Sequence, residues 1–239
     1  MRKPGWLSRV TLDWSRFEEA SRVSREIVQE LAANRPVLRA IVLEAAANGQ
    51  LRTLAEKHGE LNYIVLCDDL DRGLRMRLHR FSKGLEDIPH NHRFSFSSAI
   101  LGGSYVHTMF ELNRGDDDAA GEAAWRLDQP VGTFTGGKVK EIRLVGLTTV
   151  LTTTQAVGSS YSMHHQAVHK TAMPETDAFS LFVRGPTQMP CALQLEPEKR
   201  TYRWKFGREH EAADVISGRA MSPGEYQRFV GSLEAAAII

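Results

Sequence analysis

The first part of the chain repeats its hydrophobic residues with the period of a helix. Over residues 14–34 the apolar positions fall three or four residues apart, at Phe17, Ala20, Val23, Ile27 and Leu31. This spacing places them on one side of a helix, so we expect an amphipathic helix over this range. Pro36 fits the first turn of a second helix, which we expect to be interrupted near Asn48 and Gly49 and to continue to about His58. Both helices are expected to pack against the outside of a sheet.

After Gly59 the pattern changes to that of strands, in short runs separated by clusters of Gly, Asp and Asn. We expect strands over residues 62–67, 74–81, 94–101, 104–112, 131–134, 141–153, 160–163, 178–184 and 201–206. The last of these alternates Tyr202, Trp204 and Phe206 with basic residues, which is typical of a strand with one buried face. Short strands with frequent turns predict a mainly β fold, either a barrel or a sandwich.

Several short motifs predict turns and one helix start. The glycine pairs Gly102-Gly103 and Gly136-Gly137 are expected to form hairpin turns, and the acidic stretch at residues 116–118 is expected to be a solvated hairpin loop. Near the C-terminus, Ser222-Pro223-Gly224-Glu225 combines a cap residue, a first-turn proline and a glutamate at the third helical position. This capping box predicts a last helix.

The length of the chain, 239 residues, is enough to bury one sizeable core. We therefore expect a single domain over residues 1–239, divided into a helical N-terminal segment (1–58), a β-barrel (60–207) and a C-terminal helical tail (208–239).

Composition excludes several classes of function. The chain has 30 Lys and Arg against 29 Asp and Glu, and no dense basic tract, so neither a nucleic acid nor a membrane surface is expected as a partner. The two cysteines, Cys67 and Cys191, are too few for a disulfide framework. The chain starts without an apolar signal core and lacks a stretch of about 20 apolar residues, so we expect a cytoplasmic protein. The pattern leaves its oligomeric state open.

Histidines carry the clearest chemical signal. His90 and His92 stand one residue apart, so on a strand they share one face and can direct two imidazoles at a single ion. A second cluster follows with His164, His165 and His169. Imidazole is a common ligand for Fe, Cu, Zn and Ni, so the pattern predicts a mononuclear metal site without naming the metal.

The sequence around these histidines resembles that of a known superfamily. The segment Gly84-Leu85-Glu86-Asp87-Ile88-Pro89-His90-Asn91-His92, followed by Gly102-Gly103-Ser104-Tyr105, is similar to the first motif of the cupins, which form a small antiparallel β-barrel or jelly roll. The segments Ala167-Val168-His169-Lys170 and Phe179-Ser180-Leu181-Phe182-Val183-Arg184-Gly185-Pro186 are similar to the second motif of the cysteine dioxygenase branch. In that thiol dioxygenase branch, three histidines hold ferrous iron.

The resemblance implies a metal shell of His90, His92 and His169 around Fe(II). The general cupin motif has a glutamate four or five residues after the second histidine, where this chain has Phe96 and Ser97. The thiol dioxygenase branch also lacks that carboxylate. His169 fits the motif best as the third ligand, with His164 and His165 as alternatives, and His107 is a further candidate or else a hydrogen-bonded barrel histidine.

The resemblance also implies a small-molecule substrate and O2. Arg184 is the preferred substrate anchor on the ground of strand alternation, and the alternative is that it caps a barrel end and pairs with a structural carboxylate. Cysteine dioxygenases have a Ser-x-His-x-Tyr strand near iron, where this chain has Ser180-Leu181-Phe182-Val183-Arg184. Strand alternation places Ser180, Phe182 and Arg184 on one face, from which the guanidinium can bind a carboxylate in a bidentate manner. Other candidate anchors lie on the preceding strand, and they are Arg75, Arg77 and Arg80.

Tyr105 and Tyr161 are candidate hydrogen-bonding groups in the pocket, although tyrosines in a barrel wall are usually structural. The resemblance implies an iron- and O2-dependent oxygenase of the dioxygenase type, acting on a small carboxylate-bearing molecule such as an amino acid or thiol. The alternatives are an iron hydroxylase or desaturase of a biosynthetic pathway, and a non-catalytic cupin that binds a metal or a ligand.

Overall fold

A computed structural model describes Gly5 and residues 9–59, 61–114, 124–130, 139–172, 175–196, 201–206, 211 and 213–239. Three helices come first: α1 (Phe17–Ala33), α2 (Arg35–Ala47) and α3 (Gly49–Thr53). A series of strands follows: β1 (Glu56–His58), β2 (Leu61–Asp69), β3 (Leu74–Phe81), β4 (Phe96–Gly102), β5 (Ser104–Arg114), β6 (Ala124–Pro130), β7 (Val139–Ala156), β8 (Ser160–Met163), β9 (Val168–Ala172), β10 (Ala178–Arg184), β11 (Cys191–Glu196) and β12 (Thr201–Phe206). The short 3-10 turn η1 (Leu70–Arg72) joins β2 to β3, and α4 (Ala213–Arg219) and α5 (Pro223–Ala235) end the chain.

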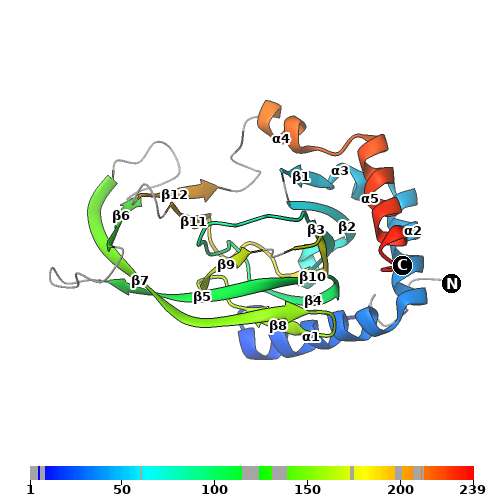
Figure 1. Ribbon diagram of the computed structural model, residues 1–239, viewed down its shortest axis with the longest axis horizontal. Coiled ribbons are helices and arrows are strands. Elements are labelled where there is room, and N and C mark those ends of the chain that lie inside the picture. The colour runs from blue at the N-terminus through cyan, green and yellow to red at the C-terminus, as the bar shows by residue number, and fades with distance from the viewer. Residues whose placement is uncertain are drawn as a thin grey trace.

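The strands form antiparallel sheets that face one another. The first sheet has the order β1-β2-β3-β10-β4-β8, and the second has the order β6-β7-β5-β9. Single bridges from His90 to His169 and to Gln194 insert the segment around His90 between β9 and the β11-β12 pair. In Figure 1, β6 and the neighbouring part of β7 extend to the end of the molecule opposite α5. The expected fold class, mainly β with antiparallel strands and with helices before and after them, is confirmed.

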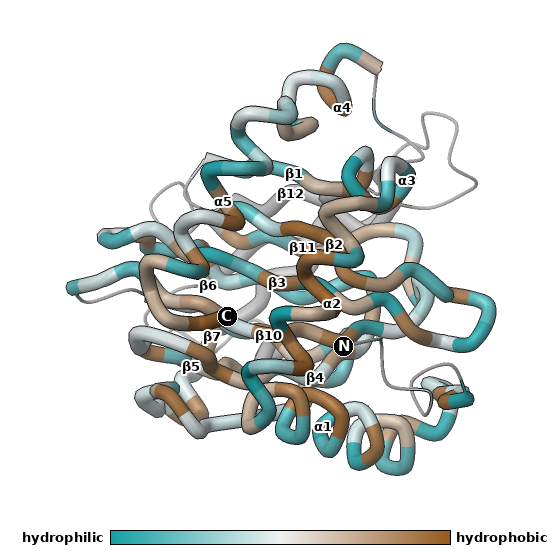
Figure 2. The backbone as a smooth tube through the Cα atoms, turned by 90° about the vertical axis from the view of Figure 1, so that its right-hand side faces the viewer, coloured by the Kyte–Doolittle hydropathy of each residue, from teal (hydrophilic) through white to brown (hydrophobic). Residues whose placement is uncertain are grey.

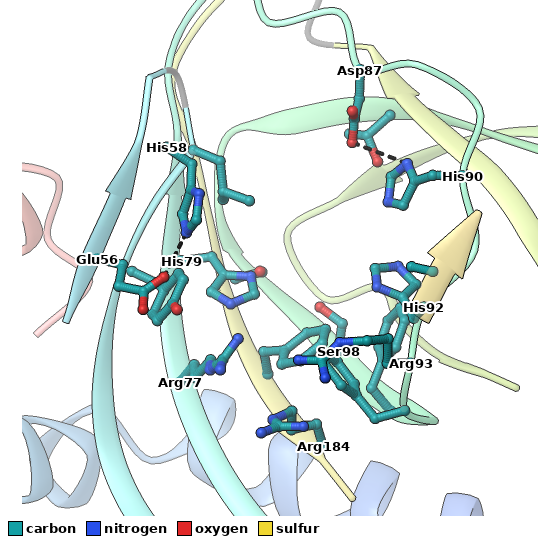
Figure 3. A pocket seen from close by; sticks show the side chains of 18 of the residues that line it. Glu56, His58, Arg77, His79, Asp87, His90, His92, Arg93, Ser98 and Arg184 are labelled. Atoms are coloured by element: carbon teal, nitrogen blue, oxygen red, sulfur yellow. Dashed lines mark hydrogen bonds and ion pairs between the residues drawn. The ribbon is translucent and has the colours of Figure 1, made fainter. Parts of the chain in front are cut away.

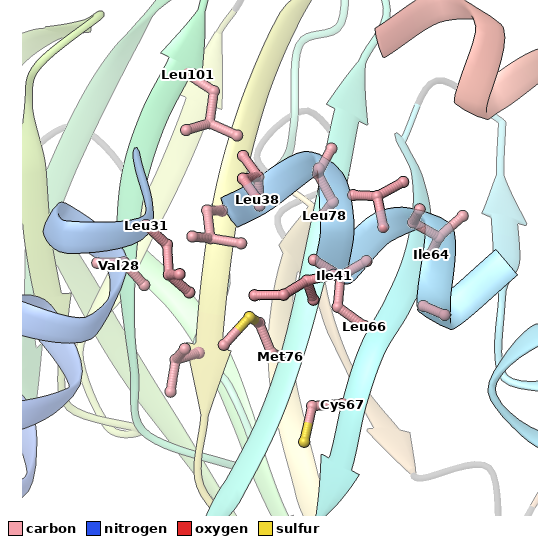
Figure 4. Packing of buried hydrophobic residues seen from close by; sticks show 14 of the residues in the cluster. Val28, Leu31, Leu38, Ile41, Ile64, Leu66, Cys67, Met76, Leu78 and Leu101 are labelled. Carbon is pink, nitrogen blue, oxygen red and sulfur yellow. The ribbon is translucent and has the colours of Figure 1, made fainter. Parts of the chain in front are cut away.

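The helices cover the outer face of the first sheet. Residues that recur along one side of α1, Ala20, Ile27, Val28 and Leu31, are buried there, as are Leu38 and Ile41 of α2. They pack against Ile64, Met76, Leu78 and Leu181 from β2, β3 and β10 (Figure 4). Figure 2 shows hydrophobic residues recurring along α1 and α2, which lie over the strands. Full burial of each such leucine or isoleucine contributes about 1.5–3 kcal/mol to folding, so this layer holds the sheet in place.

Buried hydroxyl groups also attach α1 to the sheet. Ser24 on α1 lies with its Oγ atom 2.6 Å from Oγ of Ser97 on β4, which is in turn 2.7 Å from Oγ of Ser162 on β8. Ser97 and Ser162 both lie within hydrogen-bonding distance of the Ser21 carbonyl oxygen. Because these hydroxyls bond one another, their burial leaves no unpaired oxygen at this contact.

Two expectations about local structure are wrong. The second helical region ends at Thr53, and Glu56–His58 forms the edge strand β1, paired with β2. Gly102-Gly103 is a corner, because β4 belongs to the first sheet and β5 to the second. The expected strand at 131–134, the acidic stretch at 116–118 and the turn at Gly136-Gly137 lie outside the described residues.

The last helix starts as its sequence predicts. The Ser222 side chain accepts a hydrogen bond from the Glu225 N–H, and the Glu225 side chain accepts one from the Ser222 N–H. Tyr226, Phe229 and Leu233 of α5 are buried in the same hydrophobic layer as α1 and α2. No described helix combines the length and the apolar character that crossing a bilayer requires.

Candidate metal centre

A cavity of about 810 Å³ lies between the facing sheets. Its walls come from the inner faces of strands whose other faces contact the helices. On β10, for example, Phe179, Leu181 and Val183 belong to the hydrophobic layer under the helices, and Ser180, Phe182 and Arg184 line the cavity. Because side chains alternate along a strand, one face of β10 packs against the helices and the other lines the cavity.

Three histidines meet at one wall of this cavity. One ligand atom from each of His90, His92 and His169 lies within 4.8 Å of the other two. The backbone fixes this convergence, because the His90 N–H donates to the His169 carbonyl at 2.8 Å and the His169 N–H donates to the His90 carbonyl at 2.9 Å. On the other side, Leu195 N–H donates to the Pro89 carbonyl at 2.8 Å. The segment thus behaves as a strand, and its alternate residues His90 and His92 face the cavity (Figure 3).

Hydrogen bonds determine which ring nitrogens remain for a metal. Nδ1 of His90 lies 2.8 Å from the Ile88 carbonyl oxygen and 3.4 Å from Oδ2 of Asp87. Nδ1 of His169 lies 2.8 Å from Nε2 of His107. These contacts orient both rings and leave their Nε2 atoms for a ligand, as outer partners do in metal sites. Nε2 of His92 lies 2.8 Å from Nε2 of His169.

This arrangement fits a transition-metal ion. Nitrogen ligands lie about 2.0–2.1 Å from such an ion, so two adjacent nitrogens on an octahedral ion are about 3 Å apart. The His92 and His169 nitrogens are already close to that separation at 2.8 Å. Burial, followed by the nearby His90 and His92, lowers the pKa of His169 well below its usual value, which keeps the imidazole in the neutral form that binds metals.

No carboxylate joins the cluster among the described residues. Phe96, one of the two residues that replace the glutamate of the general cupin motif, lies with its ring centroid 4.9 Å from that of His92. Ser97 points the other way, toward Ser24 of α1. A metal held here would therefore keep the full charge of the free ion.

The other histidines occupy supporting or peripheral positions. His107 is buried, and burial lowers its pKa to about 4, so it is neutral when it bonds His169. The His165 N–H donates to Oγ of Ser95, and the His164 ring meets Phe17 of α1 edge-on at 5.0 Å. Neither His164 nor His165 belongs to the three-histidine cluster.

Arg184 and Arg77 supply positive charge to the same cavity. Arg184 is only 4% exposed, and its Cζ atom lies 4.1 Å from the centroid of the Phe94 ring. Its Nη1 atom donates to the Gly185 carbonyl at 3.3 Å. Arg77 stacks over Tyr63 at 4.2 Å. Burial, followed by the charges of Arg77 and Arg75, lowers the pKa of Arg184 to about 8, because both disfavour its charged form.

The remaining arginine candidates form ion pairs. Arg75 lines the cavity but binds Asp68 through two hydrogen bonds of 2.7 and 2.8 Å. Arg80 alternates to the other face of β3 and binds Asp177 at 2.7 Å. Their guanidinium groups are therefore already neutralised by carboxylates.

The two tyrosines form one unit. Their hydroxyl oxygens are 2.9 Å apart, and burial raises the pKa of both. Tyr161 lines the cavity, whereas Tyr105, which is 1% exposed, is absent from its walls and lies behind Tyr161. The Tyr161 ring also contacts His107, with centroids 4.8 Å apart.

Sequence reasoning missed two cavity residues. His79 lies on β3 and stacks on Phe182 at 4.6 Å, and Phe94 lies against His92 at 5.7 Å. The signal for His79 was the alternation Arg75, Arg77, His79, which places all three on one strand face. Phe94 carries no comparable signal, because it follows the irregular segment after His92.

No protein-family model and no curated protein matches the chain. Among solved structures, the chain is similar to DMSP lyase DddQ from Ruegeria pomeroyi, with 11% identity over 61% of this chain and 59% of that one and a TM-score of 0.36. It is similar to an oxalate oxidase, with 14% identity over 57% of this chain and 55% of that one and a TM-score of 0.32. It is also similar to an RmlC-like cupin from Ralstonia eutropha, with 12% identity over 59% and 62% and a TM-score of 0.33. In each case the chain spans less than two thirds of the other protein, and likenesses this weak bear on neither reaction nor substrate.

Proposed function

We propose that the chain is a mononuclear non-heme Fe(II) oxygenase of the thiol dioxygenase branch of the cupins, which uses O2 to oxidise a small carboxylate-bearing molecule. The observation that carries this proposal is the convergence of three imidazoles on a cavity that also contains a buried guanidinium. Three protein ligands leave coordination positions for exogenous groups, which a closed four-ligand structural zinc site does not.

The ferrous ion, held by His90, His92 and His169, would supply the redox chemistry by which O2 reacts with the organic substrate. The rest of the task falls to the protein. Arg184 binds the substrate carboxylate and so fixes which carbon or sulfur atom faces the metal. Phe94, Phe96 and Phe182 line the cavity and exclude water from the space between that anchor and the histidines.

Tyr161 is the protein's hydrogen-bonding group beside the substrate. Its hydroxyl bonds that of Tyr105, and both pKa values are raised, so both hydroxyls keep their protons at neutral pH. A protonated Tyr161 can donate a hydrogen bond to an oxygen or sulfur atom of the bound substrate. Tyr105 orients that hydroxyl from behind the cavity wall.

Metal binding and oxygen consumption test the proposal. Anaerobic reconstitution of the purified protein with Fe(II) should give one iron per chain, and His90→Ala, His92→Ala and His169→Ala should each lose most of it while remaining folded, because none belongs to the hydrophobic layer. His164→Ala is the matched control and should retain iron. Equal iron content in the wild type and the three variants would reject the ligand assignment.

The products of the reaction separate the proposed activity from its alternatives. Iron-dependent uptake of O2 with a panel of amino acids, thiols and larger carboxylates should be found, and both atoms of ¹⁸O2 should appear in the product. One labelled atom would indicate a hydroxylase, and none, with loss of two hydrogens, a desaturase. Tightly bound zinc and no oxygen uptake would instead identify a binding protein.

A further inference from the structure

The wall of the cavity formed by β3 and β10 carries a patch of four polar side chains, which we call the anion patch: Arg77, His79, Ser180 and Arg184. All four side chains line the cavity. Ser180 lies directly opposite His79 in the strand pairing, and Phe182, which separates Ser180 from Arg184, lies opposite Arg77. The patch is therefore continuous across two adjacent strands. Figure 3 shows Arg77, His79 and Arg184 at the side of the cavity away from His90.

Each member of the anion patch has a buried polar atom without a hydrogen-bond partner among the described residues. These atoms are Nε of Arg77, Nε2 of His79, Oγ of Ser180 and Nε of Arg184. Buried polar groups in folded proteins are almost always bonded, so four such atoms on one surface require an explanation. A ligand that accepts hydrogen bonds from this surface would provide one.

The positive charges of Arg77 and Arg184 are a second, independent indication of an anionic ligand. Arg77 and Arg184 both approach the Phe94 ring, at 5.9 and 4.1 Å. In the described part of the chain, neither forms an ion pair, although Arg75 and Arg80 on the same strand as Arg77 each bind an aspartate. Two buried guanidinium groups without an ion-pair partner are costly unless an anion of matching charge joins them.

We infer that Arg77 and Arg184 together bind a head group with two negative charges, so that the substrate of the proposed oxygenase is a dianion with an apolar body. This inference takes from the proposed function only that the cavity is the substrate site. A single carboxylate would leave one of the two guanidinium groups unneutralised. Two carboxylates or one phosphate match both charges, and Oγ of Ser180 offers a further hydrogen bond.

The apolar part of the substrate follows from the walls beside the anion patch. Phe182 packs against Phe96 with ring centroids 4.5 Å apart, and Phe96 lies 4.9 Å from His92. An aromatic surface therefore leads from the anion patch to the metal centre. The cavity volume of about 810 Å³ falls in the range of pockets for drug-sized ligands and is larger than a simple amino acid needs.

Calorimetric titration of the full-length, metal-free protein at pH 7 tests the inference with three probes: phthalate, benzoate and inorganic phosphate. Phthalate and benzoate share an aromatic ring and differ by one carboxylate, so their affinity ratio measures the response to the second charge. We expect phthalate to bind at least about 10-fold more tightly than benzoate. Arg77→Gln and Arg184→Gln should each weaken phthalate binding at least about 10-fold and bring the two affinities close together.

Control variants show whether the effect belongs to the anion patch. Arg80→Gln removes the same charge from the opposite face of β3 and should preserve the phthalate preference. Arg77→Lys and Arg184→Lys keep the positive charge and should retain part of the phthalate preference. Thermal unfolding verifies that each variant is folded. If inorganic phosphate competes with phthalate and its binding requires both arginines, the head group is a phosphate. If phosphate does not compete, the head group consists of two carboxylates.

Equal affinity for phthalate and benzoate in the wild type would overturn the inference. So would a preference that survives both glutamine substitutions, or one that is lost equally in Arg80→Gln. Because the titration uses neither iron nor O2, a failure here would leave the oxygenase proposal standing, and a failure of iron-dependent oxygen uptake would leave the anion site standing.

Discussion

At the scale of single residues, the contact between His107 and His169 shows how a residue outside the cluster can orient a candidate metal ligand. His107 is 3% exposed, and its Nε2 atom lies 2.8 Å from Nδ1 of His169. Burial lowers the pKa of His107 to about 4, so its ring is neutral at pH 7. Its Nε2 atom can therefore accept a hydrogen bond from the N–H group at Nδ1 of His169. This hydrogen bond selects the tautomer of His169 whose Nε2 atom is free for the ion.

Replacing His107 should weaken metal binding without unfolding the protein. We expect His107→Leu to lower the affinity for Fe(II) or Zn(II) by about 10–100-fold, because the variant loses the partner that orients His169. Competition with a chelator measures the affinity. His79→Leu, which changes another buried cavity histidine without contact to the cluster, should keep wild-type affinity. An unchanged affinity in His107→Leu would show that the backbone alone orients His169.

Much of the candidate site can be predicted from the sequence, and there is a physical reason why the rest cannot. His90 and His92 could be placed on one face because strand alternation is local, and His169 was favoured over its neighbours by its match to a motif. The position of Arg77 beside Arg184 could not be predicted, because it depends on the pairing of β3 with β10, more than 90 residues later in the chain. Asp177, the partner of Arg80, was hidden for the same reason, whereas Asp68, the partner of Arg75, lies close in sequence on the paired strand β2.

At the scale of elements, Gly103 turns the chain from one sheet to the other. Its φ angle is +67°, and a Cβ atom added there would lie 2.2 Å from the Asp177 carbonyl oxygen. Both the backbone conformation and the close approach of β10 therefore require glycine. Gly84 also has a positive φ angle, +80°, but a Cβ atom there would meet nothing within 4 Å.

The different surroundings of Gly84 and Gly103 predict that replacement by alanine destabilises the protein to different extents at the two positions. Gly84→Ala should destabilise the protein by about 1–2 kcal/mol, which is the cost of a left-handed backbone for alanine. Gly103→Ala should cost about 1–3 kcal/mol more, because the corner must also move away from Asp177. Urea unfolding of the two variants measures both values. Equal destabilisation would mean that the corner relaxes freely.

The cap of α5 also has a measurable pH dependence. Contacts with Lys57 and then Ser222 lower the pKa of Glu225 from 4.5 to about 2. Because the pKa is lower in the folded chain than in the unfolded one, the charged carboxylate stabilises the fold fully above about pH 4.5, and this contribution disappears as the pH falls toward 2. Glu225→Gln should therefore be less stable than the wild type at pH 7, and the two should converge in acid.

Urea unfolding at a series of pH values tests the expectation for Glu225. Glu234→Gln, which changes a half-exposed carboxylate at the other end of α5, should have little effect at any pH. A stability difference between Glu225→Gln and the wild type that is constant from pH 7 to pH 2 would contradict the role assigned to the charge.

Elements with a regular internal signal were predicted, and those without one were missed. The period of α1 and the four-residue cap of α5 appear in the structure within a few residues of their expected positions. The strands β1, β6, β9 and β11 were missed, since β1 has only three residues and the other three mix polar and apolar residues without a long alternating run. For β1, pairing with β2 determines the structure.

At the scale of the whole molecule, some strands that lie side by side in a sheet are close in sequence and others are far apart. Antiparallel strands with helices before and after them follow from the sequence pattern. The order β3-β10-β4 does not, because β10 inserts between two strands that precede it by more than 75 residues. That insertion brings Ser180 and Arg184 onto the wall that also carries His79 and Arg77, and so creates the cavity chemistry.

The reciprocal backbone bonds between His90 and His169 set the spacing of two histidines of the cluster without any contribution from their rings. These main-chain hydrogen bonds measure 2.8 and 2.9 Å. An ion that binds to the three imidazoles would therefore require movement of side chains and none of the backbone. We expect removal of such an ion by a chelator to leave the pairing of these two segments in place.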